Sequence, residues 1–420
     1  MRALYSLLIR FYLAGVWLAS FFSPKARQWV DGRKGLFKKM AEAAPRSGKI
    51  AWFHCASLGE FEQGRPVIEK FRKDFPEYQI LLTFFSPSGY EIRKNYPGAD
   101  HIFYLPPDTP NNVKRFLELW DPQLAVFVKY EFWFNFIHGL HKRNIPVVLV
   151  SAIFRPGQHF FRFYGGWFRK QLGKFSAVFV QDQASLDLLG KAGINNARIS
   201  GDTRFDRVFE VSRAPMNFPE VEKFAFGKTV MVCGSTWPAD EQLLLPLMNN
   251  EQLDMKFIIA PHEIREESIK KLQENLRVKS ARYSLVKGPV PEETRVLIIN
   301  RIGMLSQLYQ YGQMAYIGGG FGRGIHNILE AATFGLPVFF GPHYQKFSEA
   351  RELISRQGAF SVRESRQLEE KVKSFLADQA VFSKAAETCR NYVKEKKGAT
   401  RIIMDGLSNL MIETSVSGNQ

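Results

Sequence analysis

The stretch that decides the fold is KIAWFHCASLGEFEQGRPVIEKFRKDFPEYQILLTFF, residues 49–85. It opens with a short apolar run at residues 49–55, passes through an amphipathic stretch, and ends in a second apolar run at residues 78–85. Runs of this length are typical of buried strands, and the stretch between them is long enough for a helix. Strand, helix and strand in this order predict a parallel sheet covered by helices on both faces.

The same alternation continues along the chain and is interrupted once. Around residues 205–228 it breaks into a stretch with two prolines and no clear period, which predicts a linker at residues 211–227. We therefore expect an α/β protein with two Rossmann-like domains facing a cleft, at residues 41–210 and 228–400. The further strands predicted lie at residues 101–106, 122–129, 145–152, 177–182, 197–202, 229–235, 255–262, 294–300, 314–320 and 336–342.

The composition supports this two-domain reading and points to an anionic partner. A chain of 420 residues is too long for one ordinary core, and 45% hydrophobic with 23% charged residues is typical of a folded protein. The formal net charge of +16 suits nucleic acid, an acidic membrane surface or a phosphorylated substrate. The three cysteines show no metal-ligand spacing, so we expect them to be reduced and buried.

The first 22 residues are apolar except for two arginines and a few small polar groups. That length is just enough to span a bilayer, but Arg10 makes spanning costly, so a helix lying in the interface is the alternative. The stretch after Phe22 carries six basic residues, which we expect on the cytoplasmic side at anionic headgroups. Residues 1–40 are therefore predicted to be a membrane anchor with a basic segment. Residues 401–420 are predicted to form a C-terminal helix or tail that packs back on the first domain.

The second domain holds a glycine-rich turn between a strand and an expected helix, residues 317–342. We expect the helix to open near His326 and Asn327, with Glu330 one turn further along and able to bind ribose hydroxyls. Bare backbone amides at such a turn, including that of Gly319, favour phosphate. Other turns expected to face the same cleft follow neighbouring strands: Ser235, Thr236, Pro261, His262, Ile302, Gly303 and Met304.

The first domain offers two glutamates that follow apolar strands, Glu60 and Glu131. Both would lie at the carboxyl edge of a parallel sheet, where α/β folds bind their ligands. The plain alternatives are a helix-start carboxylate for Glu60 and an ion pair with Lys129 or Arg143 for Glu131. The aromatic and basic stretch at residues 159–170 suits a lipid interface or single-stranded bases, and the apolar N-terminus favours the lipid.

These motifs together resemble the 3-deoxy-D-manno-octulosonic acid (Kdo) transferases of lipopolysaccharide synthesis, membrane-associated glycosyltransferases of the GT-B fold. The resemblance runs from the N-terminal apolar segment to about residue 400. The residues that carry it are His54-x-x-Ser57-x-Gly59-Glu60, Ser86-Pro87-Ser88-Gly89, Tyr104-Leu105-Pro106-x-Asp108, Glu131-x-Trp133-x-Asn135, Ile145-Pro146-Val147-Val148, Ser235-Thr236, His326-Asn327-x-x-Glu330 and Gly341-Pro342-His343.

The resemblance implies transfer of Kdo from CMP-Kdo to a tetraacylated lipid A precursor with inversion, at the cytoplasmic face of the inner membrane. It implies that Glu60 is the general base, since an acceptor hydroxyl needs its proton removed as the anomeric carbon gains positive charge. It makes Glu131 a second active-site carboxylate. The CMP site would be formed by the turns at Pro261-His262 and Ile302-Gly303-Met304 and by Asn327 to Glu330, with Ser235, Thr236, Gly319 and His326 beside them. No metal, other cofactor or nucleic acid is expected.

Some positions depart from the family's pattern and indicate a divergent branch. The family usually has a glutamate where Lys129 stands, a histidine at Trp237 and an aspartate at Asn300, and the glycine loop at 318–326 is one residue shorter. The rival predictions are another GT-B enzyme acting on a UDP- or GDP-sugar, a sugar-nucleotide epimerase, and a non-catalytic basic protein on a membrane or nucleic acid. The number of Kdo units, the acceptor's acylation and phosphorylation, and the oligomeric state stay open.

Overall fold

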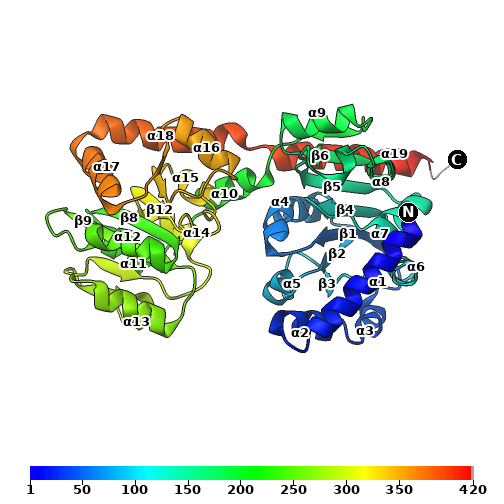
Figure 1. The fold of residues 1–420 in the computed structure, drawn as a ribbon, viewed down its shortest axis with the longest axis horizontal. Coiled ribbons are helices and arrows are strands. Elements are labelled where there is room, and N and C mark those ends of the chain that lie inside the picture. The colour runs from blue at the N-terminus through cyan, green and yellow to red at the C-terminus, as the bar shows by residue number, and fades with distance from the viewer. Residues whose placement is uncertain (418–420) are drawn as a thin grey trace. The chain divides into compact units, whose positions relative to one another are not determined.

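The computed structural model describes residues 1–417 (Figure 1). The chain forms two compact units. Unit 1 is Met1–Arg207 together with the C-terminal segment that starts at Lys397, and unit 2 is Val208–Lys396. Each unit contains one seven-stranded sheet in which every paired strand is parallel.

The sheet of unit 1 has the strand order β3-β2-β1-β4-β5-β6-β7. Side chains alternate along β1: Ile50 and Trp52 belong to one core cluster, and Ala51 and Phe53 belong to another. This period of two places one core on each face of the sheet, as expected for a strand that helices cover on both sides. The strands are β1 (Lys49–Cys55), β2 (Tyr78–Phe84), β3 (His101–Tyr104), β4 (Leu124–Val128), β5 (Val147–Ala152), β6 (Ala177–Val180) and β7 (Ala197–Ile199). The helices are α4 (Leu58–Asp74), α5 (Pro87–Arg93), α6 (Pro110–Trp120), α7 (Phe134–Lys142), η1 (His159–Phe161), α8 (Gly166–Leu172) and α9 (Gln183–Lys191).

The sheet of unit 2 has the order β10-β11-β9-β8-β12-β13-β14. Its strands are β8 (Thr229–Thr236), β9 (Met255–Pro261), β10 (Ser280–Arg282), β11 (Val296–Ile298), β12 (Met314–Ile317), β13 (Val338–Phe340) and β14 (Ala359–Ser361). Its helices are α12 (Pro238–Met248), α13 (Glu266–Asn275), η2 (Tyr283–Leu285), α14 (Leu305–Leu308), η3 (Tyr309–Tyr311), α15 (Leu329–Ala332), α16 (Ser348–Ser355), α17 (Ser365–Ala377) and α18 (Gln379–Lys396). The edge strands β10 and β14, of three residues each, were not predicted.

The segment predicted as a linker is largely helical. It contains the end of α10 (Thr203–Arg213) and all of α11 (Pro219–Ala225). Pro219 occupies the first turn of α11, where a missing N–H costs nothing, and Val221 and Phe224 are buried. The two prolines therefore mark a helix start and the gap before it, and the segment contributes side chains to the interior of unit 2.

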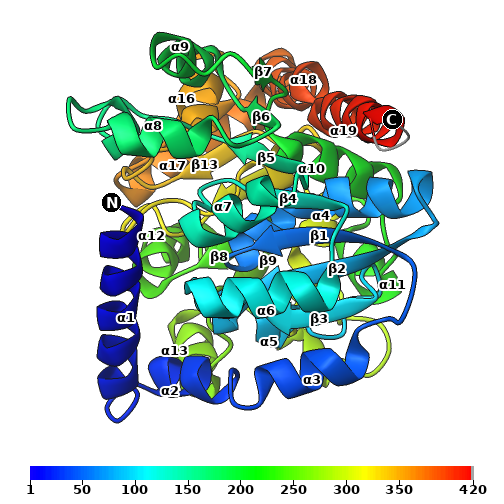
Figure 2. The same cartoon turned by 90° about the vertical axis from the view of Figure 1, so that its right-hand side faces the viewer.

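The N-terminal 43 residues form three helices that lie along unit 1 (Figure 2): α1 (Arg2–Ala19), α2 (Pro24–Asp31) and α3 (Leu36–Ala43). Trp29 and Met40 are buried, so α2 and α3 are part of the fold of unit 1. Arg33 corrects the expectation that all the bases of this segment meet headgroups. Its guanidinium lies 3.7 Å from the ring centroid of Trp29 and donates to the carbonyl oxygens of Leu105 and Phe85 at 3.0 and 2.8 Å. Burial lowers the pKa of Arg33 to about 9.

The C-terminal helix α19 (Ala399–Ser417) belongs to unit 1, where it packs against α4 (Figure 1). Ile403 and Leu407 are fully buried in the same core cluster as the inner face of α4. The carboxylate of Asp206 fixes the start of α19, since it accepts hydrogen bonds from the backbone N–H of Gly398 at 2.6 Å and of Thr400 at 2.8 Å. The chain thus returns to unit 1 after it has built unit 2.

The strand orders place a switch point in each sheet. In unit 1 the strands that follow β1 in the chain, β2 and β3, lie on one side of it, and the strands that follow β4 lie on the other side. In unit 2 the strand order reverses in the same way between β8 and β12. Ligands of open α/β sheets bind beyond the carboxyl ends of the strands at this point. The loops after β1, β4, β8 and β12 are therefore the first places to look for a site.

Candidate functional site

Glu60 lies beyond β1, in the first turn of α4. Ser57 is the residue before the helix, and its hydroxyl donates a short hydrogen bond to Oε2 of Glu60. A carboxylate in the first turn is stabilised by the unpaired N–H groups and the positive end of the helix dipole. Glu60 is only half-buried, so it is held in place and still reachable by a substrate.

Glu131, beyond β4, is largely buried and belongs to a polar cluster with His54 and Trp133. Oε2 of Glu131 lies 3.0 Å from Nε2 of His54 and accepts a hydrogen bond from the indole N–H of Trp133 at 2.5 Å. The other ring nitrogen of His54 lies 2.9 Å from the hydroxyl of Thr83, and that hydroxyl accepts the indole N–H of Trp52. Glu131 pairs with a fully buried histidine, a partner that was not considered from the sequence.

The ends of β1 and β4 bring the two glutamates into one electrostatic environment. Burial raises the pKa of the Cys55 thiol, and the charges of Glu60 and Glu131 raise it further. Burial also raises the pKa of Tyr130, which Arg155 lowers and Glu60 raises. The two carboxylates thus act on the same neighbours, as expected for residues that flank a switch point.

Asp108 anchors the helix that follows Glu131, a role that its sequence position did not reveal. The fully buried carboxylate accepts the backbone N–H groups of Asn135 and Phe136 at 3.0 Å each, at the start of α7. It also accepts the hydroxyl of Tyr5, on α1, at 2.7 Å. Burial raises the pKa of Asp108 to about 6, and these hydrogen bonds oppose the rise. Asp108 therefore ties α1 to the loop that carries Glu131 and Trp133.

In unit 2 the loops after β8 and β12 touch at their backbones. A Cβ on Gly318 would lie 2.2 Å from the carbonyl oxygen of Ser235, and Gly319 has a φ of +92°, so neither position accommodates a side chain without a shift. The carboxylate of Asp240, on α12, accepts the backbone N–H of Gly319 at 2.9 Å and the hydroxyl of Tyr316 at 2.9 Å. This buried aspartate holds the glycine turn in place, and burial raises its pKa.

Three aromatic rings meet beside the glycine turn. The ring of His262, after β9, stacks on Trp237 with 4.6 Å between centroids and on His326 with 4.4 Å. The indole N–H of Trp237 donates to Nε2 of His326 at 3.1 Å. The predicted residues His262, His326 and Gly319 are thus brought together, and Trp237, noted in the sequence only as a departure from the family, lies at their centre.

The helix expected to open at His326 begins three residues later, and it is short. His326 and Asn327 lie in a loop, and α15 covers only Leu329–Ala332, with Glu330 in its first turn. The side-chain amide of Asn327 donates to Oε1 of Glu330 at 3.1 Å, and its Oδ1 accepts the backbone N–H of Leu329. The helix therefore opens later than predicted, because Asn327 makes a local turn instead. Several amides of the glycine turn are also engaged, since those of Gly318, Gly319, Gly322 and Gly324 donate to oxygens of the protein.

The remaining predicted turn, Ile302 to Met304, follows β11. Ile302 is 92% exposed, and Gly303 has a φ of +89°. The chain then enters α14 and η3, where Leu305 and the hydroxyl of Tyr309 pack against Gly234. Burial raises the pKa of Tyr309, and the charge of Glu330 raises it further, so η3 lies close to α15. Pro261 ends β9, directly before His262.

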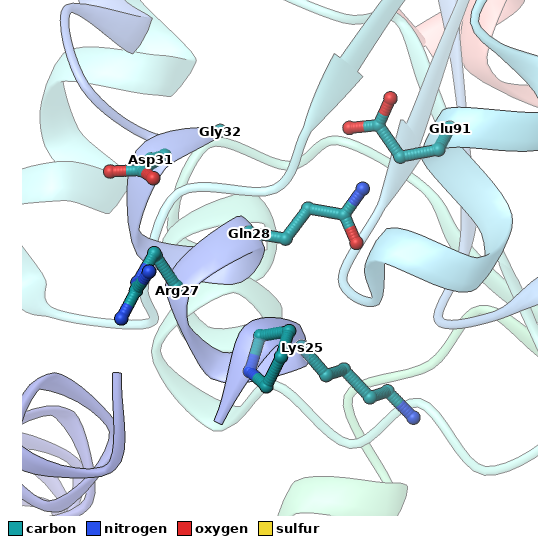
Figure 3. Close-up of a pocket in the computed structure, with 7 residues that line it drawn as sticks. Lys25, Arg27, Gln28, Asp31, Gly32 and Glu91 are labelled. Atoms are coloured by element: carbon teal, nitrogen blue, oxygen red, sulfur yellow. The ribbon is translucent and has the colours of Figure 1, made fainter. Parts of the chain in front are cut away.

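An open groove lies on unit 1 between α2 and α5 (Figure 3). Lys25, Gln28 and Asp31 line it from α2, and Glu91 lines it from α5. None of the predicted site residues faces this groove, and charges of both signs line it. Among residues 1–417 no group of three His, Cys, Asp or Glu side chains is arranged to hold a metal ion.

The comparisons with known proteins agree with the fold and the motifs. Residues 29–207 match the family model described as 3-deoxy-D-manno-octulosonic-acid transferase (kdotransferase). The 3-deoxy-D-manno-octulosonic acid transferase of Rickettsia felis is 28% identical over 359 residues, 83% of this chain and 76% of that protein. The enzyme of the same name from Haemophilus influenzae is 25% identical over 406 residues, 94% of each chain.

A solved structure supports the fold. UDP-GlcNAc 2-epimerase from Neisseria meningitidis, solved with UDP-GlcNAc bound, has a TM-score of 0.61 and 16% identity. It covers 86% of this chain and 100% of that chain, and at this identity it bears on the fold alone. The expected fold class, two Rossmann-like units as in GT-B proteins, is confirmed by the two parallel sheets and this likeness. In sequence the chain is similar to the 3-deoxy-D-manno-octulosonic acid transferases, a family of glycosyltransferases.

Proposed function

We propose that the protein transfers Kdo from CMP-Kdo to a tetraacylated disaccharide lipid A precursor, with inversion at the anomeric carbon. The observation that carries this proposal is Glu60: a half-buried carboxylate beyond β1, at the switch point of a parallel sheet. We infer the sugar from the names of the relatives given above, and the reaction type from the position of Glu60.

Glu60 acts as the general base in this proposal. It removes the proton of the acceptor hydroxyl while that oxygen attacks the anomeric carbon and CMP leaves as the anion. Positioned proton transfer of this kind contributes about 10²- to 10⁴-fold to a rate. The hydrogen bond from Ser57 and the position at the start of α4 orient the carboxylate before the acceptor binds.

Glu131 serves as a positioning carboxylate rather than as a second base. It is 6% exposed and its Oε2 is engaged by His54 and Trp133, so it has little freedom to reach a substrate proton. By holding the loop after β4 rigid it supports the surface next to Glu60, since tightly held surroundings keep a catalytic group in its productive geometry.

Unit 2 binds the CMP moiety at the switch point between β8 and β12. The glycine turn, which lets a ligand approach the backbone closely, and Ser235 at the end of β8 suit the phosphate, with Thr236 buried beside them, and the pair Asn327–Glu330 suits the ribose hydroxyls. Pro261, His262 and the turn Ile302–Met304 complete the donor site. These donors stabilise the departing anion electrostatically, so the proposed reaction involves no metal.

The protein acts at the cytoplasmic face of the inner membrane, on which α1 lies rather than spans. The helix is long and apolar enough to cross a bilayer, by length and composition only. Its Tyr5 and Ser6, however, hydrogen-bond to Asp108 and Asn135 of unit 1. Its other side exposes large apolar residues, and the exposed Phe163 follows η1 near Trp167, whose ring lies 6.3 Å from Tyr5. The exposed large apolar residues of α1 are Leu4, Leu7, Leu8, Phe11, Tyr12, Trp17 and Leu18.

The decisive experiment follows labelled Kdo, supplied as CMP-Kdo made in the reaction, onto tetraacyl lipid A precursor. Wild type should give product, and Glu60→Gln should lose at least 100-fold in rate while it unfolds at the same temperature. Glu62→Gln is the matched control, since Glu62 lies on the same helix and pairs with Arg93. Product from both Glu60→Gln and wild type would remove Glu60 from its role. No product from any variant, with protection by UDP rather than CMP, would favour another sugar nucleotide.

Membrane binding has its own test, flotation with vesicles that contain anionic phospholipid. Replacing Leu8 and Phe11 by serine, or Phe163 by serine, should lower the bound fraction severalfold because exposed apolar area no longer enters the lipid. Phe226→Ser is the control, because Phe226 is 86% exposed but lies in unit 2. Equal flotation of all four proteins would contradict the proposed face.

A further inference from the structure

Trp237 makes the one side-chain hydrogen bond to His326 in the described part of the chain. It occupies the position before α12, directly after β8, and its indole N–H lies 3.1 Å from Nε2 of His326. His262 stacks on both rings, with planes inclined by 26° and 25°. A hydrogen-bonded pair of rings covered by a third ring leaves little room for His326 to turn.

This hydrogen bond decides which ring nitrogen of His326 carries the proton. An indole N–H only donates, so Nε2 of His326 has to present its lone pair. Burial, and then the charge of His262, lowers the pKa of His326 to about 4, so the ring is neutral at physiological pH. A neutral imidazole with a bare Nε2 carries its proton on Nδ1.

Trp237 is itself fixed by the residue that fixes the glycine turn. Its backbone N–H donates to Oδ2 of Asp240 at 2.9 Å, and the same oxygen accepts the backbone N–H of Gly319 at 2.9 Å. The backbone N–H of His326 donates to the carbonyl oxygen of Gly318 at 3.1 Å. Trp237, His326 and the glycine turn are therefore held as one assembly, with Asp240 as the shared partner.

Nδ1–H of His326 is left as a donor. Within residues 1–417 no hydrogen bond involves Nδ1, and the ring is only partly buried. The ring lies beside the glycine turn with its Cδ2–Nε2 edge toward Gly319, since a Cβ there would come within 3.0 Å of Cδ2 and 3.3 Å of Nε2. Nδ1–H is on the opposite edge of the ring, where a neutral N–H group can donate to an oxygen of a ligand.

We propose that Trp237 is a positioning residue of the donor site: its indole N–H holds His326 in the Nδ1–H tautomer, and Nδ1–H is the donor that His326 offers to the bound nucleotide. This inference rests on the proposed function for the identity of the nucleotide, CMP. In this role Trp237 acts through His326 and needs no substrate contact of its own. A side chain at position 237 without an N–H donor would let His326 exchange between its two neutral tautomers.

The first test reads the tautomer directly in the full-length protein. In ¹⁵N-histidine-labelled protein the long-range proton–nitrogen spectrum distinguishes a protonated Nδ1 from a protonated Nε2, and His326→Asn identifies the signal. Wild type should show Nδ1–H, and Trp237→Phe, which keeps an aromatic ring, should show a mixture. Trp120→Phe is the matched control, because the indole N–H of Trp120 is buried without a partner and its loss breaks no hydrogen bond. A pure Nδ1–H signal in Trp237→Phe would overturn the inference.

The second test measures the affinity for CMP by calorimetry. Trp237→Phe should raise the Kd about tenfold, the effect of one weakened hydrogen bond to a charged group, and change kcat little. His326→Asn keeps an N–H near the place of Nδ1 and should bind CMP better than His326→Gln. Because Trp237 acts through His326, adding Trp237→Phe to His326→Asn should cost almost nothing further. Additive losses would show that Trp237 acts independently and would overturn the inference.

The two tests separate this inference from the proposed function. If wild type binds no CMP, the proposed donor fails, and the histidine spectra still decide whether Trp237 sets the tautomer. The unfolding temperature of every variant is measured alongside, so that a loss of affinity in a destabilised variant is recognised.

Discussion

The carboxyl edges of the two sheets have the same topology and opposite chemistry. Unit 1 presents carboxylates at its switch point, Glu60 half-exposed and Glu131 buried against His54. Unit 2 presents glycines, backbone amides and a neutral ring cluster at the equivalent point. The comparison teaches that the strand order sets where a site forms, whereas the residues that follow β1 and β8 decide what the site does.

Buried carboxylates support both edges, and removing them should have the largest effect. Glu131→Gln and Asp240→Asn should each destabilise their own unit by about 2–3 kcal/mol, since each buried carboxyl group has several hydrogen-bond partners that the variant would leave incompletely paired. Hydrogen exchange measured by mass spectrometry reads each unit separately. Glu131→Gln should slow transfer and leave the Kd for CMP unchanged, and Asp240→Asn should raise that Kd at least tenfold. Equal effects of both variants on CMP binding would contradict the assignment of CMP binding to unit 2.

Glycines at the two edges should respond differently to an added methyl group. Gly318→Ala should cost about 1–3 kcal/mol and weaken CMP binding, because the new Cβ would lie 2.2 Å from the carbonyl oxygen of Ser235. Gly59→Ala, beside Glu60, meets only the hydroxyl of Ser57 at 3.7 Å. It should raise stability by about 0.5 kcal/mol, since alanine loses less backbone entropy in a helix. Urea unfolding checks both, and a tolerated Gly318→Ala would mean that the loops after β8 and β12 separate easily.

Two groups, one in each unit, should change stability with pH in opposite directions, the smallest effect predicted. Asp108 has its pKa raised from 3.8 to about 6, so the folded state holds the proton more tightly and stability falls as pH rises through this window. His326 has its pKa lowered from 6.5 to about 4, so the unfolded state binds more protons and stability rises with pH. One group contributes at most about 1.4 kcal/mol per pH unit.

Urea unfolding of wild type, Asp108→Asn and His326→Asn at pH 4, 5 and 6 isolates these contributions. The difference between wild type and Asp108→Asn should shrink as pH rises, and the difference for His326→Asn should grow. Slopes of the same sign for both pairs would contradict the assignment of one raised and one lowered pKa.

The sequence was enough to predict most of the fold and the outline of the site. Apolar runs predicted β1, β4, β8 and β12, because buried parallel strands are apolar on both faces. These are the four strands that flank the two switch points. The helices of the predicted linker were missed, since two prolines concealed α11. The ring cluster was beyond prediction, because Trp237, His262 and His326 are separated in sequence and meet only when β8, β9 and β12 pair. Likewise Glu131 and His54 are 77 residues apart, and only the pairing of β1 with β4 joins them.

The return of α19 to unit 1 has a consequence for how the protein is made. A ribosome releases residues 1–207 and then the whole of Val208–Lys396 before α19 is synthesised. Until then the apolar side of α4 that receives Ile403, Met404 and Leu407 is exposed to water. Unit 2 can therefore finish folding first, although it is translated second. Meanwhile the nascent unit 1 presents an uncovered apolar strip of the kind that chaperones bind during translation.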